Sequence, residues 1–342
     1  MNLKTGMCIV IFTRRRQNER IYQYSKYKKI LSGKKGKSLF TKSRSFVKAL
    51  DNINLELKQG EILGLIGESG CGKSTLGRIL SRLEEPTDGD VYIDGLSTKQ
   101  IMKSDSKGFR RLVQIIFQNP YDSFTPKNTI EEILLRPLKI HNIAENDAER
   151  KKILITELEN GGLHPAADFL KRYPHQLSGG QLQRISIIRA MLLKPQFIIA
   201  DEPVSMLDVS VRADIINMLL NLKKQYHATI VFISHDISLT RYISDKIAVM
   251  YLGRIVEYGD ADDIIKNPKH PYTKVLISNC GSSDPTEKTE KIFIQGEPPT
   301  PIDPKDMCYF APRCFMATDE CFGSYPDTKK LYEGHIAACH KL

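Results

Sequence analysis

A nine-residue stretch from Gly67 to Thr75, reading GESGCGKST, restricts the possible folds of this chain more than any other feature. It matches the pattern G-x-x-x-x-G-K-[ST], with a β-rich run at 61–66 before it and a helix-like segment at 76–80 after it. A strand, loop and helix of this kind place backbone amides around phosphate groups at a helix N-terminus. The stretch therefore predicts a phosphate-binding loop on an α/β fold.

The residues of this loop have separate expected roles. Lys73 would neutralise the charge of the β- and γ-phosphates of a nucleotide, and Ser74 would offer its hydroxyl to Mg²⁺. Cys71 is interpreted as a small tolerated residue rather than a redox centre. The predicted ATP-binding residues of the loop are Gly67, Ser69, Gly70, Cys71, Gly72, Lys73, Ser74 and Thr75.

A second candidate element of the site lies at residues 197–202, which read FIIADE. The apolar run predicts a buried strand that delivers two carboxylates at its carboxyl end. This is the Walker B arrangement, in which Asp201 would hold Mg²⁺, directly or through water, and Glu202 would polarise the water that attacks the γ-phosphate. A phosphate loop alone would leave kinases, GTPases, helicases and motor ATPases open.

The organisation of the chain follows from its alternating patterns. From residue 46 onward, short β-rich runs such as 61–66 and 229–234 alternate with helix-like segments, which predicts an α/β fold with a largely parallel sheet. The β-branched runs fade between 118 and 180, so we expect a helical insertion at about 119–180. We expect a basic, partly disordered N-terminal extension at 1–45, an ATPase domain at 46–265 and a small loop-rich C-terminal module at 266–342.

The net charge of +10 belongs to the N-terminal arm, since residues 1–48 hold fourteen Lys and Arg against the single acid Glu19. The favoured interpretation is a solvated, partly disordered extension, and a contact with nucleic acid or an anionic membrane surface is the alternative. No apolar run approaches the roughly 18 to 20 residues of a spanning helix. The run from Met7 to Phe12 precedes its arginines, the wrong order for a secretory signal, so we expect a cytoplasmic protein that crosses no membrane.

The stretch Leu177 to Gln181, reading LSGGQ, resembles the signature motif of ABC ATPases and lies between the two elements above, as in that family. A serine and two glycines that open a helix form a second anion-binding nest, and one chain does not need two nests for one phosphate. The resemblance implies that two ATPase domains pair head to tail, so that each signature closes on the ATP of its partner. The residues predicted to act on the partner's ATP are Ser178, Gly179, Gly180 and Gln181.

Other family elements follow in order over residues 46 to about 260. Gln118 resembles the Q-loop glutamine, Asp208 the D-loop aspartate and His235 the switch histidine. The resemblance implies that Gln118 links the site to the transmembrane interface and that His235 contacts the γ-phosphate. It also implies a RecA-like P-loop NTPase core with an antiparallel β edge.

The aromatic side chain that would stack on adenine is Phe46 in our prediction. Tyr24, Tyr27 and Phe40 are the alternatives that the N-terminal arm offers.

Three further stretches narrow the family. YPHQ at 173–176, Gln183-Arg184 and HPYT at 270–273 together look like the ATPases of oligopeptide and dipeptide importers. In that group, a tail similar to the one here can hold a [4Fe-4S] cluster, and four thiolates are the ligand set that such a cluster requires. The predicted ligands are Cys308, Cys314, Cys321 and Cys339.

Two alternatives stay open for the cysteine tail. Zinc would be held by the four thiolates, or by three of them with His335 or His340. The other alternative is four unligated thiols.

The resemblance implies a subunit that binds and hydrolyses ATP with Mg²⁺ to energise an importer of oligopeptides or dipeptides. The expected partners are a second, different ATPase subunit, two transmembrane permeases and an extracytoplasmic substrate-binding protein, with no direct nucleic-acid contact. The expected location is peripheral, at the cytoplasmic face of the cell membrane.

Three rival functions remain open at this stage. A nickel or metal-chelate importer of the same family is one alternative. An ABC exporter subunit is a second, set aside mainly on the tail and the HPYT stretch. A soluble ABC ATPase that acts on nucleic acid or ribosomes is the distant one.

Overall fold

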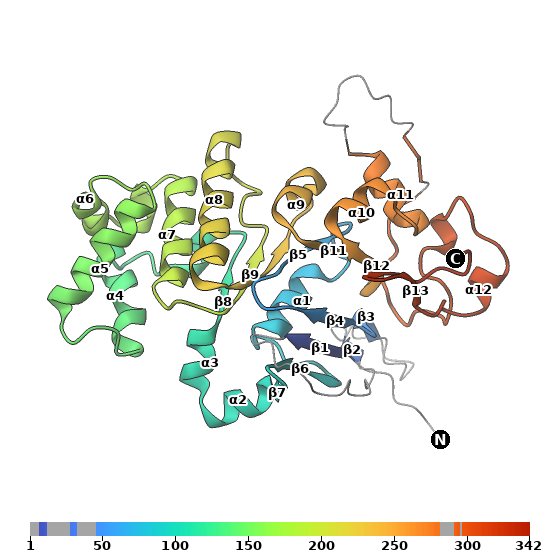
Figure 1. The fold of residues 1–342 in the computed structure, drawn as a ribbon, viewed down its shortest axis with the longest axis horizontal. Coiled ribbons are helices and arrows are strands. Elements are labelled where there is room, and N and C mark those ends of the chain that lie inside the picture. Colours follow the sequence, from blue (N-terminus) through green and yellow to red (C-terminus); the bar gives the residue numbers. More distant parts are fainter. Residues whose placement is uncertain (1–6, 12–27, 33–45, 281–290, 295) are drawn as a thin grey trace, which may run out of the picture. The chain divides into compact units, whose positions relative to one another are not determined.

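The computed structural model describes residues 7–11, 28–32, 46–280, 291–294 and 296–342 (Figure 1). The chain divides into two compact units. The first consists of Met1–Lys58, Ile62–Thr98 and Ser234–Leu342, and the second of Gln59–Glu61 and Lys99–Ile233. None of the helices among the described residues combines the length and the apolar character that a membrane span requires.

The first unit contains five neighbouring strands in the order β13-β14-β12-β11-β5. The β5 and β11 strands run parallel, whereas the pairs β11-β12, β12-β14 and β13-β14 are antiparallel. The C-terminal segment thus extends an antiparallel edge of this sheet. The bounds are β5 Ile62–Ile66, β11 Lys246–Tyr251, β12 Arg254–Asp260, β13 Lys329–Tyr332 and β14 His335–Ala337.

Two smaller sheets complete the strands of this unit. One has the order β4-β1-β6-β7, and the other pairs β2 with β3. Their bounds are β1 Met7–Ile11, β2 Lys28–Ser32, β3 Phe46–Asp51, β4 Asn54–Leu57, β6 Gly89–Ile93 and β7 Leu96–Ser97. Within residues 1–45, for which the sequence predicts a partly disordered extension, the structure describes the two strands β1 and β2. The other residues of this extension lie outside the described part of the chain.

One apolar core joins the sheet of the first unit to the C-terminal region. Ile66 of β5 and Tyr251 of β11 are buried in the same cluster as Tyr272 and Phe310. Because burial of such large side chains is the main favourable term in folding, the C-terminal residues are part of this core rather than an appendage beside it. The helices of this unit are α1 Lys73–Leu80, α9 Ile237–Ile243, α10 Ala261–Lys266, α11 Pro271–Ser278, η3 Ala311–Arg313 and α12 Glu320–Gly323.

The second unit has three parallel strands in the order β10-β9-β8. Every residue of β9 and β10 is buried, as the continuous apolar runs in the sequence predict for a parallel sheet. The bounds are β8 Val113–Ile116, β9 Phe197–Asp201 and β10 Thr229–Ile233.

The remaining part of the second unit is helical. Figure 1 shows α4, α5 and α6 grouped together, and a separate apolar core fills the space between these helices and α7. Thr129 and Glu132 form a reciprocal capping box that begins α4. The bounds are α2 Thr98–Ser104, α3 Ser106–Leu112, η1 Pro120–Ser123, α4 Ile130–Ile140, α5 Asp147–Asn160, α6 Ala166–Lys171, η2 Pro174–Gln176, α7 Gly179–Met191 and α8 Val209–Tyr226.

Candidate functional site

The phosphate loop leaves the buried strand β5 and enters α1. A Cβ atom on Gly67 would lie 2.2 Å from the carbonyl oxygen of Met250, so no side chain fits there. Gly72 caps α1 with a φ of 106°, a left-handed conformation that favours glycine. The two glycines therefore let the backbone pass close to its neighbours and open the helix toward the loop.

The Lys73 side chain folds back over this loop. Its Nζ donates to the carbonyl oxygens of Gly67 at 2.7 Å and Glu68 at 3.0 Å. The side chain is buried, and the loop carbonyl oxygens replace some of the water that would otherwise solvate the ammonium group. This arrangement holds one positive charge against the loop backbone, as phosphate binding requires.

The other loop residues divide by exposure. Ser69, Gly70 and Ser74 are exposed, and Thr75 is half-buried in the first turn of α1. Cys71 is buried, and burial raises the pKa of its thiol. A thiol that stays protonated is a weak nucleophile, which supports a packing role for Cys71.

Glu68, which the sequence analysis did not assign, is held by two residues from the C-terminal region. Its backbone N–H donates to the Tyr272 hydroxyl oxygen at 2.8 Å. Its carboxylate accepts from both terminal nitrogens of Arg313, at 2.7 and 3.0 Å. Tyr272 belongs to the HPYT stretch and Arg313 precedes Cys314, but no local pattern indicates that either of them contacts the loop.

Phe46, the predicted adenine-stacking residue, begins β3 and is partly exposed. Its backbone is fixed to Asp303, whose carboxylate accepts from the Phe46 N–H at 3.0 Å and whose own N–H donates back at 2.9 Å. The alternatives Tyr24, Tyr27 and Phe40 lie outside the described residues. The role of Phe46 in adenine stacking therefore stays a prediction, and two hydrogen bonds to Asp303 hold its backbone.

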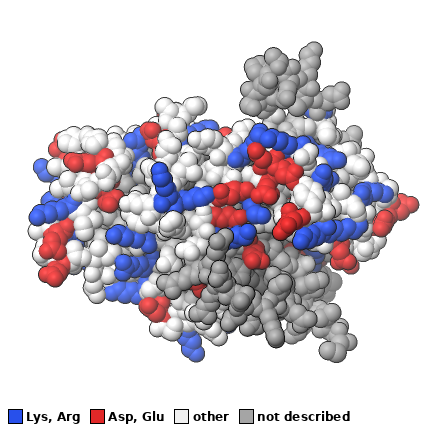
Figure 2. All heavy atoms as spheres, in the orientation of Figure 1, with Lys and Arg blue, Asp and Glu red and all other residues white. Residues whose placement is uncertain are grey.

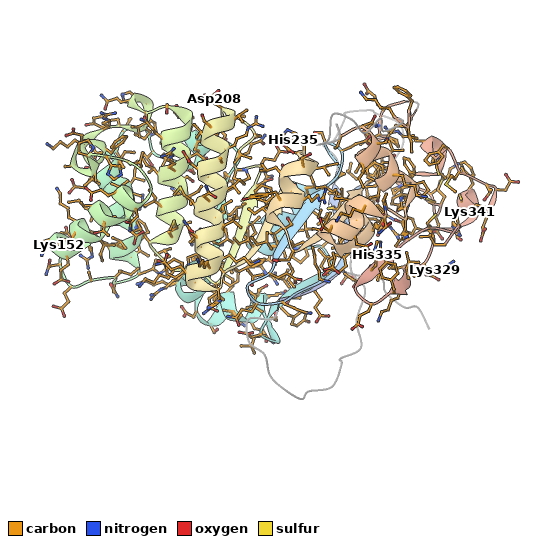
Figure 3. The ribbon with its side chains drawn as sticks, turned by 45° about the horizontal axis from the view of Figure 1, so that its top comes forward. Lys152, Asp208, His235, Lys329, His335 and Lys341 are labelled. Atoms are coloured by element: carbon orange, nitrogen blue, oxygen red, sulfur yellow. The ribbon has the colours of Figure 1, made fainter. Side chains whose placement is uncertain are left out.

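His235 is exposed just before α9 (Figure 3). The turn that carries it is fixed on both sides. The Ser234 N–H donates to the Leu65 carbonyl of β5 at 3.3 Å, and the Asp236 carboxylate accepts from the Leu239 N–H at 2.9 Å as the helix cap. The exposed imidazole is thus presented by a well-anchored turn.

In the second unit, the Glu202 carboxylate and Gln118 are brought together. The Gln118 Nε2 donates to Glu202 Oε2 at 2.9 Å and lies 3.4 Å from the Ser205 hydroxyl oxygen. Glu202 adopts a φ of 46°, in the left-handed region that is costly for a residue with a side chain. Asp201, which ends β9, is buried. Strained backbone conformations cluster at active sites, which makes Glu202 a candidate functional residue.

The signature stretch begins α7. Ser178 is the cap residue, and its hydroxyl accepts from the Gln181 N–H at 3.3 Å while its own N–H donates to the Gln181 side-chain oxygen at 3.1 Å. Gly179 and Gly180 are the first two helical residues, where amides lack acceptors within the helix. The capping box therefore sets a helix N-terminus that is suited to an anion.

Asp208, the predicted D-loop residue, lies at the N-terminus of α8, where Figure 3 labels it. Two large apolar side chains close to it are exposed, Met206 at 67% and Val209 at 80%. The Arg212 Nε fixes the loop by donating to the Leu207 carbonyl oxygen at 2.8 Å. This part of the second unit therefore exposes two large apolar side chains on either side of Asp208.

The prediction of an iron–sulfur site in the tail is wrong. Cys308, Cys314, Cys321 and Cys339 all line one small cavity. Nevertheless, in the part of the chain that the structure describes, no group of three or more His, Cys, Asp or Glu side chains has a metal-binding arrangement. Burial raises the pKa of the Cys308 thiol to about 11 and also raises those of Cys314 and Cys339, so these residues stay protonated thiols at neutral pH.

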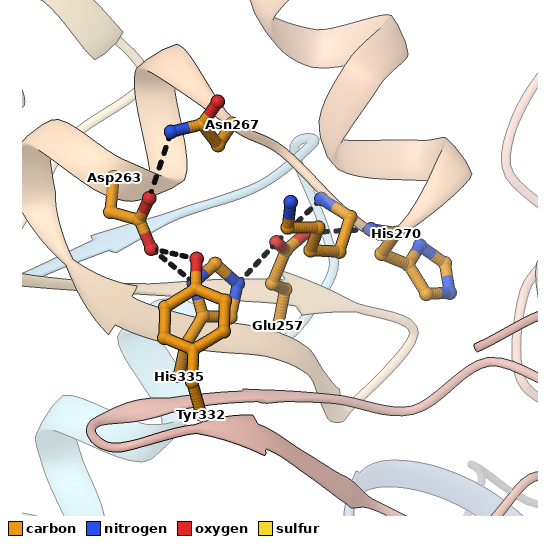
Figure 4. Close-up of polar contacts among 7 residues, drawn as sticks. Glu257, Asp263, Asn267, His270, Tyr332 and His335 are labelled. Atoms are coloured by element: carbon orange, nitrogen blue, oxygen red, sulfur yellow. Dashed lines mark hydrogen bonds and ion pairs between the residues drawn. The ribbon is translucent and has the colours of Figure 1, made fainter.

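The tail is instead fixed by a buried polar network around His335 (Figure 4). Its Nε2 lies 2.7 Å from a Glu257 carboxylate oxygen, and its Nδ1 lies 2.6 Å from Asp263. Glu257 also accepts from the backbone N–H groups of Lys269 at 2.7 Å and His270 at 2.9 Å. The network ties β14, β12, α10 and the start of α11 together.

Two family models match this chain. The one described as ABC transporter covers residues 50–205, and the one described as oligopeptide/dipeptide transporter, C-terminal region, covers residues 256–321. The first contains the phosphate loop, Gln118, the signature stretch and both carboxylates. The second contains Tyr272 and Arg313.

Similar proteins extend along most of the chain. The putative oligopeptide transport ATP-binding protein YkfD of Bacillus subtilis is 46% identical over 296 residues, which are 86% of this chain and 89% of that protein. The dipeptide transport ATP-binding protein DppF of Haemophilus influenzae is 45% identical over 307 residues, 90% of this chain and 92% of that protein.

Among solved structures, the dimeric post-hydrolysis state of the ATP-binding cassette MJ0796 bound to ADP and Pi aligns with a TM-score of 0.60. It has 31% sequence identity and covers 68% of this chain and 96% of that one. The predicted fold class, a P-loop NTPase with a mostly parallel sheet, is confirmed.

Proposed function

Because this chain belongs to the ABC transporter ATP-binding proteins of the oligopeptide/dipeptide transport family, we propose that it is the ATP-hydrolysing subunit of a peptide importer. One observation carries the proposal. An ABC core at 50–205 and a peptide-transporter C-terminal region at 256–321 occur together in one chain. The peptide names of the relatives do not favour the nickel or metal-chelate alternative.

The proposed chemistry assigns phosphate binding to the loop at 67–75 and to Lys73. The donor set fits Mg²⁺, because a hydroxyl on Ser74 and a carboxylate on Asp201 are the hard oxygen ligands that this ion prefers. When bound, Mg²⁺ would neutralise phosphate charge. Glu202 would orient and polarise the attacking water, and the hydrogen bond from Gln118 holds one oxygen of its carboxylate in place. His235 is assigned to the γ-phosphate.

We further propose that the chain works as half of a heterodimer of ATPase subunits. The support for a dimer lies in the anion-suited N-terminus of α7 and in the exposed Met206 and Val209 beside Asp208, whereas a different second subunit is what the family resemblance implies. Large apolar side chains that are exposed together at one place are typical of an interaction surface. In this proposal Ser178 and the glycines after it complete the ATP site of the second subunit.

The proposed partners beyond that dimer are two transmembrane permeases and an extracytoplasmic binding protein, with the chain peripheral at the cytoplasmic face of the membrane. A nucleic-acid role is the weaker alternative. Figure 2 shows lysines and arginines interspersed with acidic side chains over the described part of one face, rather than gathered into a stripe along which a phosphate backbone would run.

The test is peptide uptake in cells that lack the gene for this chain. Radiolabelled dipeptide and tripeptide uptake should fall, and the wild-type gene should restore it while Glu202→Gln should not. Uptake of ⁶³Ni is measured in the same cells. Loss of nickel uptake with intact peptide uptake would contradict the proposed cargo, and copurification with nucleic acid rather than membranes would contradict the transporter role.

A further inference from the structure

We propose that Tyr272 and Arg313 are positioning residues of the nucleotide site. From the C-terminal region they hold Glu68, and through Glu68 they orient the loop backbone and the Lys73 ammonium group for phosphate. The inference rests on the proposed role of residues 67–75 in ATP binding. It gives the HPYT stretch and the arginine of the cysteine tail a part in ATP chemistry.

Each polar group of Glu68 has a fixed partner. The backbone N–H donates to the Tyr272 hydroxyl oxygen at 2.8 Å, and the carboxylate accepts two hydrogen bonds from Arg313 at 2.7 and 3.0 Å. The carbonyl oxygen accepts from Lys73 Nζ at 3.0 Å. Glu68 is therefore a direct physical link between the C-terminal region and the lysine that meets the phosphates.

The two holding residues are themselves rigid. Tyr272 is fully buried, with its ring 4.6 Å from that of Tyr251 and 5.3 Å from that of Phe310 between centroids. The Arg313 side chain is 8% exposed, and its Nη1 also contacts the Tyr251 hydroxyl oxygen at 3.2 Å. Because packing already fixes both side chains, holding Glu68 costs little further conformational entropy.

Arg313 also neutralises the negative charge of Glu68. Glu68 places a carboxylate inside a loop that must attract polyphosphate, and an unpaired carboxylate there would repel it. The guanidinium of Arg313 forms a bidentate pair with that carboxylate, and these hydrogen bonds raise the arginine pKa above its ordinary value. Arg313 therefore stays charged and offsets the one acidic side chain of the loop.

If Arg313 had only a structural role, its variants would behave differently. If Arg313 served only to attach the tail, its removal would weaken nucleotide binding, if at all, by the same factor whether residue 68 is Glu or Gln. If it acts through Glu68, its removal should cost little further affinity once Glu68 is replaced by Gln. Tyr272→Phe isolates the backbone contact, since it removes one hydroxyl and keeps the buried ring.

The experiment measures binding of the non-hydrolysable analogue AMP-PNP with Mg²⁺ to the full chain by isothermal titration calorimetry. Arg313→Ala should weaken binding by about tenfold or more, as for a lost charge-assisted pair, and Tyr272→Phe by about fivefold, as for one neutral hydrogen bond. The double variant Glu68→Gln/Arg313→Ala should bind within about threefold of Glu68→Gln alone.

Arg241→Ala is the matched control, because Arg241 pairs with Asp262 at 2.9 Å on α10 rather than with the loop. Its affinity should equal that of the wild type. Wild-type affinity in folded Arg313→Ala, or a double variant that binds more than about threefold more weakly than Glu68→Gln alone, would overturn the inference. If Arg313→Ala does not fold, wild-type affinity in Tyr272→Phe overturns it. A wild-type chain that does not bind AMP-PNP would instead refute the proposed function.

Discussion

Replacing His335 by alanine should destabilise the first unit strongly, because the imidazole lies between two carboxylates in the core. His335 is 1% exposed and Glu257 is fully buried. Removing one partner of a buried hydrogen bond costs about 1 to 3 kcal/mol, and more when the group left behind is a carboxylate. Two carboxylates lose a partner here, but Glu257 keeps its two backbone N–H donors and Asp263 is 24% exposed and can be hydrated, so we expect about 3 kcal/mol.

The assay is urea unfolding followed by tyrosine fluorescence, since the chain has no tryptophan. With a denaturant slope of about 3 kcal/mol/M, the midpoint of His335→Ala should fall by about 1 M. The control Arg241→Ala breaks a largely exposed ion pair and should lower the free energy of unfolding by less than about 1 kcal/mol.

A second variant identifies the cause of the loss. His335→Ala/Glu257→Gln removes the buried charge that the single variant leaves behind, so part of the lost stability should return. An unchanged midpoint in His335→Ala would refute the assigned network. A double variant less stable than the single one would refute the charge argument, because a cavity alone would then explain the loss.

Three further outcomes are expected. Glu202→Gln should keep ATP binding, accumulate as a dimer and release phosphate about a thousandfold more slowly, as for loss of a catalytic carboxylate, and unchanged hydrolysis would refute the assignment. The Tyr332 hydroxyl and His335 hold the pKa of Asp263 at about 2. The contribution of Asp263 to stability should therefore be fully present above pH about 4 and lost as the pH falls toward 2. Asp263→Asn should reduce the fall in the free energy of unfolding below pH about 4, and an unchanged pH dependence would contradict the argument. In the folded chain the Cys71 thiol should react with maleimide much more slowly than in urea, because burial raises its pKa, and equal rates would be the contrary result.

Local motifs could be predicted because the chemistry they serve is local. A strand followed by a glycine-rich loop and a helix N-terminus needs only consecutive residues. The phosphate loop at 67–75 and the fold class could therefore be predicted from the order of the amino acids. The capping box of Ser178 and Gln181 is equally local, since its partners lie three residues apart.

Contacts between distant segments could not be predicted in the same way. The bond from Gln118 to Glu202 spans 84 residues, and that from Arg313 to Glu68 spans 245. Nothing near Arg313 in the sequence distinguishes a guanidinium that holds the loop from one that is solvated. Only the packing of Tyr272, Phe310 and Tyr251 in one core with β5 decides where that side chain lies.

The cysteine tail separates the two kinds of information most clearly. The amino-acid sequence determined that four cysteines crowd into the last part of the chain, and the structure places all four around one cavity. A metal site also needs donor atoms that converge at bonding distances, and residue spacing does not specify that geometry. The sequence by itself thus determined the phosphate loop and the family, whereas the tertiary structure decided that the tail thiols line a small cavity and that Tyr272 and Arg313 contact the loop.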